Sequence, residues 1–233
     1  MTLNSKKEEF LIYKLADNMK NCIKIDADLF RKLDVKRGLR NEDGTGVLVG
    51  LTNIGNVVGY ERTENGLKPI EGKLYFRGYE ISDLVHAVLN EQRFGFEEIA
   101  YLLLSGGLPD AEELEQFRHL LVGNMPLMSK TMLNIVELEG TDIMNILARS
   151  VLELYTYDNT PDDISRENLM RQSVELISKF PTIIAYAYNM LRHKTFGRSL
   201  HIRHPKENFS LAENFLYMLL GNNYTPLDAR TLD

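Results

Sequence analysis

The chain changes from a strand pattern to a helical pattern within one stretch, Lys73-Leu74-Tyr75-Phe76-Arg77-Gly78-Tyr79-Glu80-Ile81-Ser82-Asp83-Leu84. Its three aromatic side chains are expected to pack a small sheet onto helices, because aromatic rings bring large apolar areas. Gly78 allows the sharp backbone turn between the two patterns. Arg77 is expected to pair with an acid or to cap backbone carbonyl groups. The stretch therefore predicts a junction between a small sheet and a helical body.

A small sheet is predicted before this junction, between Gly44 and Gly78. Short runs rich in β-branched residues lie at 47–49 and 57–60, and a third strand-like run at 73–76 follows the turn signal Asn65-Gly66. Three short strands are too few to form a core by themselves. The core is therefore expected to come from the rest of the chain.

The remaining sequence has mainly the hydrophobic period of helices. Helices are predicted at 6–19, 26–33, 81–91, 94–106, 110–123, 126–137, 142–156, 162–192, 208–220 and 226–233. The predicted fold class is therefore mostly α, multi-helical, with a small β-hairpin or sheet insert near the N-terminus.

Several helix ends carry local signals. Asp110 with Glu113 resembles a capping box, and Thr160-Pro161 followed by two acids is a cap-and-proline start. Gly106-Gly107 predicts a helix stop. Pro181 lies within the longest helical pattern, where we expect a kink or a break.

The end of the sequence also reads as a helix start. Thr225 is a good N-cap, Pro226 suits the first helical position, and Asp228 places an acid in the first turn. Only five residues follow Asp228, whereas isolated helices need about 12–15 residues to be even marginal in water. We therefore expect this chain to be a fragment that stops within an element.

Composition excludes several classes of protein. The chain has 233 residues, 44% of them hydrophobic, and a net charge of -6 from 27 basic and 33 acidic residues. Without a long basic run, nucleic acid is not expected as the main partner. The one cysteine, Cys22, cannot form an intrachain disulfide, which fits a reducing cytosol. The polar N-terminus is neither a secretory signal nor a membrane span.

Histidine spacing offers one candidate metal site, His201-Ile202-Arg203-His204. The pair precedes a proline, lacks an obvious cysteine or carboxylate partner, and is flanked by Arg198, Arg203 and Lys206, which repel a cation. We therefore interpret this segment as a basic connecting loop, with no metal site.

Other polar residues predict no chemistry either. His86, His119 and His193 have no partner in the local sequence and are interpreted as structural or solvated. Glu97-Glu98 and Glu112-Glu113 lie at helix starts, where such acids are usually surface residues that favour the helix dipole. Gly44-Thr45-Gly46 lacks the lysine of a phosphate-binding loop, and no Ser-His-Asp arrangement is legible. Spacing alone therefore yields no catalytic residue.

Four segments carry a resemblance to a known family. Residues 73–84, 96–109, 178–185 and 211–219 resemble, in the same order and spacing, segments of the citrate synthase family. The resemblance covers roughly residues 37 to 233, which would form the N-terminal part of the family's large domain. Residues 1–36 are then a variable, helical N-terminal elaboration.

The resemblance implies an almost wholly helical, two-domain, cytoplasmic enzyme that works as a homodimer in the tricarboxylic acid cycle. Such an enzyme joins acetyl-CoA and oxaloacetate to give citrate and CoA, using a carboxylate base and two imidazoles, without a metal or cofactor. The resemblance places the dimer interface on the helices at 142–156 and 162–192. On the first helix we expect a second copy to cover Ile143, Ile146, Leu147, Val151 and Leu154.

The reacting groups of the family lie beyond the position equivalent to Asp233. No residue of this chain is therefore assigned a catalytic role, and the chain alone is predicted to be inactive. Arg40 is the one candidate ligand contact, because some relatives place a basic residue near the CoA phosphates. Two alternatives stay open: part of a 2-methylcitrate synthase, which uses propionyl-CoA, or a non-enzymatic helical dimerisation module.

Overall fold

The computed structural model describes residues 15, 26–33, 38–40, 46–47, 50–64, 66–137 and 141–233. The chain divides into two units, Met1–Thr52 and Asn53–Asp233. In the first unit, α2 spans Ala27–Lys32, and an isolated antiparallel bridge pairs Arg40 with Gly46. Apart from Leu15, the helix predicted at 6–19 lies outside the described residues, as do Cys22 and two residues of the run at 47–49.

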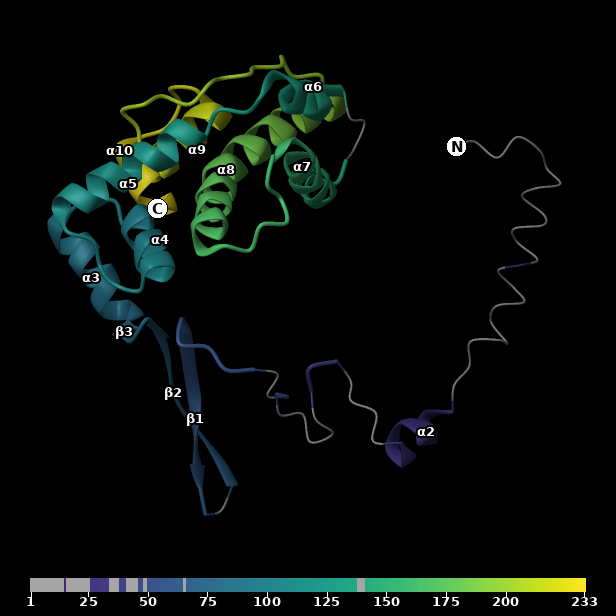
Figure 1. Ribbon diagram of the computed structural model, residues 1–233, viewed down its shortest axis with the longest axis vertical. Coiled ribbons are helices and arrows are strands. Elements are labelled where there is room, and N and C mark those ends of the chain that lie inside the picture. The colour runs from purple at the N-terminus through teal and green to yellow at the C-terminus, as the bar shows by residue number, and fades with distance from the viewer. Residues whose placement is uncertain are drawn as a thin grey trace. The chain divides into compact units, whose positions relative to one another are not determined.

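The second unit begins with the predicted sheet. It contains β1 (Gly55–Thr63), β2 (Gly66–Phe76) and β3 (Tyr79–Glu80), all antiparallel and in the order β1-β2-β3 (Figure 1). Thr63 pairs with Gly66 at the turn, where Gly66 has a φ of 112° that favours glycine. The strands predicted at 57–60 and 73–76 are thus confirmed.

Among the described residues of the second unit, eight helices follow the sheet, in agreement with the mostly α fold class. They are α3 (Ile81–Glu91), α4 (Phe96–Ser105), α5 (Ala111–Asn124), α6 (Ser129–Glu137), α7 (Ile143–Tyr157), α8 (Arg166–Phe196), α9 (Leu211–Leu220) and α10 (Pro226–Leu232). Within the described ranges, each helix is too short or too polar to cross a bilayer.

Helix α8 is the centre of the core. It contacts α5, α6, α7 and α9 (Figure 1). Ile183 and Tyr186 of α8 are buried, together with Leu121 of α5, Ile135 of α6 and Met218 of α9. Most of the unit's apolar burial is therefore organised around one helix.

The break that Pro181 could cause does not occur, because α8 runs as one helix from Arg166 to Phe196. Proline within a helix removes one backbone hydrogen bond and costs about 3 kcal/mol. Ser178 before the proline and Ile183 after it are both completely buried. Burial of the helix on both sides of the proline offsets that local cost.

The helix start predicted at Thr160 is wrong, because the N-cap of α8 is Ser165. The Asp163 carboxylate accepts hydrogen bonds from both the backbone N–H and the hydroxyl of Ser165. In the segment between α7 and α8, the Asp158 carboxylate accepts hydrogen bonds from the Arg171 guanidinium of α8 at 2.7 Å. These bonds hold the segment in a turn. The Arg171 guanidinium keeps the pKa of the Asp158 carboxyl well below its usual range.

The other predicted ends are confirmed. Asp110 and Glu113 form a capping box on α5, and Thr225 with Asp228 forms another on α10. Gly106 ends α4 with a φ of 93°. The Asp233 carboxylate accepts hydrogen bonds from the backbone N–H groups of Gly95, at 2.6 Å, and Phe96, at 3.2 Å. The last residue of the chain thus caps the start of α4.

The apolar residues that we expected at a dimer interface belong largely to the chain's own core. Ile146, Leu147 and Leu154 of α7 are buried within this one chain, and Ile143 and Val151 are partly buried. This part of the prediction is wrong, because α7 packs this face on its own neighbours α6 and α8. A separate stripe of α7 is exposed to solvent and is also apolar: Met144, Ala148, Leu152 and Tyr155.

Arg77 caps a backbone carbonyl group, as the sequence predicted, and so joins the sheet to the helices. Its guanidinium donates two hydrogen bonds to the Leu103 carbonyl oxygen of α4, at 2.8 and 3.3 Å, and one to Asn53. The backbone turns here through two positive φ angles, 50° at Arg77 and 92° at Gly78. Arg77 therefore caps a carbonyl near the C-terminal end of α4 and fixes the sheet to it.

The substitution Arg77→Gln should lower the free energy of unfolding by about 1–2 kcal/mol, because hydrogen bonds from a charged group are lost at a partly buried carbonyl. Urea denaturation followed by circular dichroism measures this change. Lys68→Gln is the matched control. It removes an exposed ion pair with Glu61 in the same sheet, so it should change stability little. Equal effects of the two substitutions would contradict the role of Arg77.

Glu97 is not the surface residue that its place at a helix start suggested. Its side chain is 1% exposed. One carboxylate oxygen accepts from the backbone N–H of Leu211 at 2.9 Å, and the other has no partner among the described residues. Burial raises the pKa of the Glu97 carboxyl above its ordinary value. The side chain joins the start of α4 to the start of α9.

A pH dependence of stability follows. The unfolded chain loses the Glu97 proton near pH 4.3, whereas the folded chain keeps it to higher pH. Between the two pKa values the folded state binds more protons, so Glu97 makes the free energy of unfolding fall as pH rises. Glu97→Gln should remove this contribution, so that stability falls less as the pH rises above the unfolded-state pKa of about 4.3.

Urea midpoints at several pH values test this expectation. The matched control is Glu112→Gln, which neutralises an exposed acid on α5 and should leave the slope as it is. A Glu97→Gln profile as steep as that of the parent chain would show that the buried carboxyl does not cause the dependence.

Candidate functional site

Arg40 is the only residue for which the sequence suggested a ligand contact. The structure places it in the first unit, with an exposed side chain. Its backbone pairs with Gly46, and next to this bridge the Val47 N–H donates to the Leu39 carbonyl oxygen at 3.1 Å. Arg40 therefore lies in a short antiparallel backbone pairing.

The two histidines of the His201–His204 segment lie in the connection between α8 and α9, as predicted. His201 is exposed, and His204 Nδ1 lies 3.4 Å from the Tyr186 hydroxyl. Nowhere in the part of the chain that the structure describes do three histidine, cysteine, aspartate or glutamate side chains gather as a metal site would require.

The other histidines are solvated or structural, as interpreted from the sequence. His86 is exposed on α3. His119 lies 3.1 Å from the Glu115 carboxylate, also on the surface of α5. His193 Nδ1 donates to the Arg198 carbonyl oxygen at 2.7 Å and so holds the chain just after α8.

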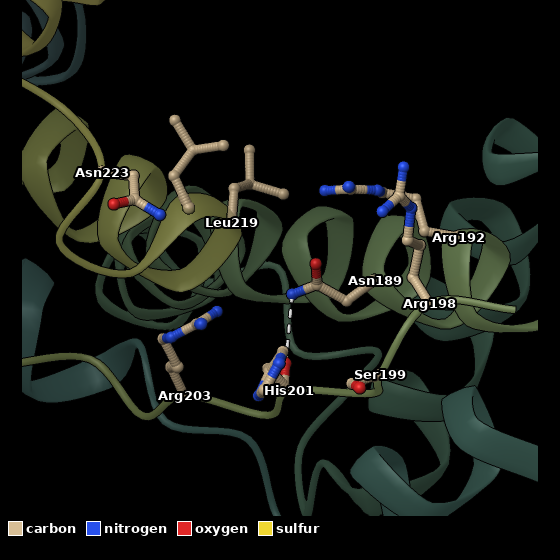
Figure 2. A pocket seen from close by; sticks show the side chains of 9 residues that line it. Asn189, Arg192, Arg198, Ser199, His201, Arg203, Leu219 and Asn223 are labelled. Atoms are coloured by element: carbon tan, nitrogen blue, oxygen red, sulfur yellow. Dashed lines mark hydrogen bonds between the residues drawn. The ribbon is translucent and has the colours of Figure 1, made fainter. Parts of the chain in front are cut away.

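Sequence reasoning missed a cavity of about 460 Å³ where the C-terminal ends of α8 and α9 meet the connection between them. Figure 2 shows the side chains that line it. They are Asn189, Arg192, Arg198, Ser199, His201, Arg203, Leu219, Leu220 and Asn223.

The connection between α8 and α9, which contributes to this cavity, is tied to α8 at three points. The Tyr186 hydroxyl donates to the Arg203 carbonyl oxygen at 3.2 Å, and Asn189 Nδ2 donates to that of His201 at 3.3 Å. The third tie is the His193 bond to Arg198. Asn189 Nδ2 also donates to the Met218 carbonyl oxygen of α9 at 3.0 Å. The buried amide of Asn189 thus holds both sides of the cavity together.

Gly221 makes room for one of the cavity's arginines. Its φ is 68°, and a Cβ at this position would lie 3.1–3.2 Å from the Arg203 guanidinium. Arg203 Nη1 also donates to the Met218 carbonyl oxygen at 3.4 Å. A side chain at position 221 would therefore strain the backbone and displace Arg203.

The lining is strongly basic although the chain as a whole is acidic. It has three arginines and a histidine but no aspartate or glutamate, whereas the net charge of the chain is -6. Among the described residues, no carboxylate forms an ion pair with Arg192, Arg198 or Arg203. Such a surface can attract anions.

The sequence alone indicated only part of this basic cavity. Arg198 and Arg203 were recognised as basic residues of one loop, but only as groups that repel a metal. Arg192 comes from α8 and Asn223 from the turn after α9. Their meeting depends on the packing of α9 against α8, which local patterns do not encode.

Comparison with known proteins gives one family. The family described as "Citrate synthase, C-terminal domain" matches residues 42–233. The citrate synthase of Deinococcus radiodurans is 33% identical over 168 residues, which are 70% of this chain and 43% of that protein.

Comparison with solved structures gives the same family. The crystal structure of citrate synthase from Pyrobaculum aerophilum has a TM-score of 0.64 and 28% identity, over 79% of this chain and 43% of the other. A Thermoplasma acidophilum citrate synthase, solved as a ternary complex with carboxymethyl coenzyme A and oxaloacetate, has a TM-score of 0.61 over 77% of this chain and 42% of its own. At 20% identity, it shows the fold alone. The chain therefore spans somewhat over two fifths of the length of each of these proteins.

Proposed function

Because the chain belongs to the citrate synthase family, we propose that it is part of an enzyme that joins acetyl-CoA, oxaloacetate and water to give citrate and CoA. The observation that carries this proposal is the family match along residues 42–233. The helical second unit, with its central α8, supports it because its fold is that of solved citrate synthases.

In this proposal the chain supplies part of the structural framework of the enzyme and not its reacting groups. Residues 37–233 belong to the large domain, and residues 1–36 are an elaboration of it. The base that deprotonates the acetyl group, the two imidazoles and the arginines that hold oxaloacetate come from family segments that follow the position of Asp233. Acid–base catalysis and electrostatic stabilisation then suffice, with acetyl-CoA as substrate and without a metal or cofactor. We place the protein in the cytoplasm, consistent with its single cysteine.

The 233-residue chain alone should have no citrate synthase activity. Mixed with acetyl-CoA and oxaloacetate, it should release no thiol above the rate without protein, because it lacks the family's base and imidazoles. A thiol-reactive dye measures the release, and a complete citrate synthase is the positive control. Turnover within the ordinary enzymatic range of about 1–1000 per second would overturn this part of the proposal.

We further propose that Arg40 contacts a phosphate of CoA. A guanidinium suits phosphate because it donates paired hydrogen bonds and stays charged. Arg40→Gln should weaken CoA binding to the chain about tenfold, as measured by equilibrium titration. Arg230→Gln, an exposed arginine of α10, is the control. Equal affinities of the two variants would exclude Arg40 from the CoA site.

Assembly as a homodimer through α7 and α8 is also proposed, with a corrected surface. The exposed stripe of α7 (Met144, Ala148, Leu152 and Tyr155) recurs at helical spacing. Two of its side chains are more than two-thirds exposed, Met144 at 72% and Leu152 at 69%. Apolar side chains so placed suit a two-fold contact, in which the same patch meets itself.

Substituting both Met144 and Leu152 by glutamate should make the chain monomeric, because the charges would be buried without partners in a two-fold contact. Light scattering over a range of protein concentrations measures the mass. Leu227→Glu is the control, since Leu227 is 65% exposed on α10. A parent chain that stays monomeric at high concentration would count against the dimer.

A further inference from the structure

We propose that the cavity between the ends of α8 and α9 binds a small polyanion, a molecule with two or more phosphate or carboxylate groups. None of the residues that line the cavity has a part in the proposed function above. The inference therefore does not depend on the proposed function.

The first argument is charge. Arg192, Arg198 and Arg203 line one cavity, and none of them forms an ion pair with a carboxylate among the described residues. Positive charges that line the same cavity repel each other. An anion that enters the cavity relieves this repulsion and forms charge-assisted hydrogen bonds, which are the stronger kind.

The second argument is the placement of the charges. Figure 2 shows Arg203 on one side of the cavity and Arg192 with Arg198 toward the other, while Asn189 and His201 lie between them. A ligand with two separated anionic groups can therefore reach both sides. A single small anion would use only one of them, so the arrangement favours a polyanion.

The third argument is that contacts within the chain hold the walls of the cavity in place. The Arg203 backbone is fixed by the Tyr186 hydroxyl, and its guanidinium by the Met218 carbonyl oxygen. The Arg192 guanidinium lies over the Tyr188 ring, 5.8 Å from its centre. Groups that are already ordered lose less entropy when a ligand binds. The site is therefore prepared for binding.

The size and the neutral groups fit a small ligand. About 460 Å³ lies within the range of about 300–1,000 Å³ that is usual for ligand pockets. Ser199 and Asn223 add neutral hydrogen-bonding groups, and Leu219 and Leu220 add an apolar wall. These features can orient a ligand that the arginines attract.

The test is isothermal titration of the purified chain at constant ionic strength, with sodium pyrophosphate in one arm and sodium citrate in the other. Binding in only one arm identifies phosphate or carboxylate as the recognised group, and binding in both identifies a general polyanion site. Binding to pyrophosphate alone, to citrate alone or to both supports the proposal when the variants below behave as expected. The absence of binding in both arms overturns it.

Matched variants locate the binding. The double substitution Arg192→Gln and Arg198→Gln should weaken binding about tenfold or more, whereas the double substitution to lysine should keep most of it. Arg166→Gln, at the other end of α8 and exposed, should leave the affinity unchanged. The single variant Arg198→Gln, in the exposed connection, provides a second test should the double variant fold poorly. Equal affinities of the parent chain and the folded glutamine variants would overturn the proposal.

Discussion

The burial of α8 is the constraint on which the rest of the second unit depends. From Ser178 to Met190, side chains on several sides of this helix are buried. A helix covered on several sides needs several partners, and α5, α6, α7 and α9 are those partners. Fully burying one large aliphatic side chain contributes roughly 1.5–3 kcal/mol, so this shared interface outweighs local defects such as Pro181. The close packing around α8 also explains why small residues occur in it, since Ala185 and Ala187 are completely buried between helices.

The helices themselves could be predicted because their signals are local. The 3.6-residue period placed each helix of the second unit, and the caps at Asp110 and Thr225 were correct because their hydrogen bonds span only three residues. The start of α8 was misplaced for the opposite reason. Thr160-Pro161 has suitable cap chemistry, but Asp158 is engaged by Arg171, 13 residues away, and the turn that results delays the helix to Ser165.

Non-local contacts also account for what the sequence could not show about sites. Glu97 has the sequence context of a surface acid, yet its partner, the backbone N–H of Leu211, lies 114 residues further along the chain. The basic cavity joins Arg192, Arg203 and Asn223 only because α9 returns to α8. Helix α7 is apolar on more than one face, so its sequence could not tell which face would enter the core. The resemblance to a family, in contrast, was carried by contiguous segments and was confirmed.

The carboxylate of Asp233 on the first turn of α4 has a consequence for how the molecule forms. Together with the contact between Glu97 and Leu211, it closes stretches of 138 and 114 residues. Contacts of such long sequence separation form slowly, because the entropy of loop closure opposes them until most of the chain is ordered. During synthesis, α3 and α4 emerge well before α9 and α10, so water must solvate the exposed amides at the start of α4 in the meantime. This corner of the molecule is therefore completed late, when α9 and α10 reach the start of α4.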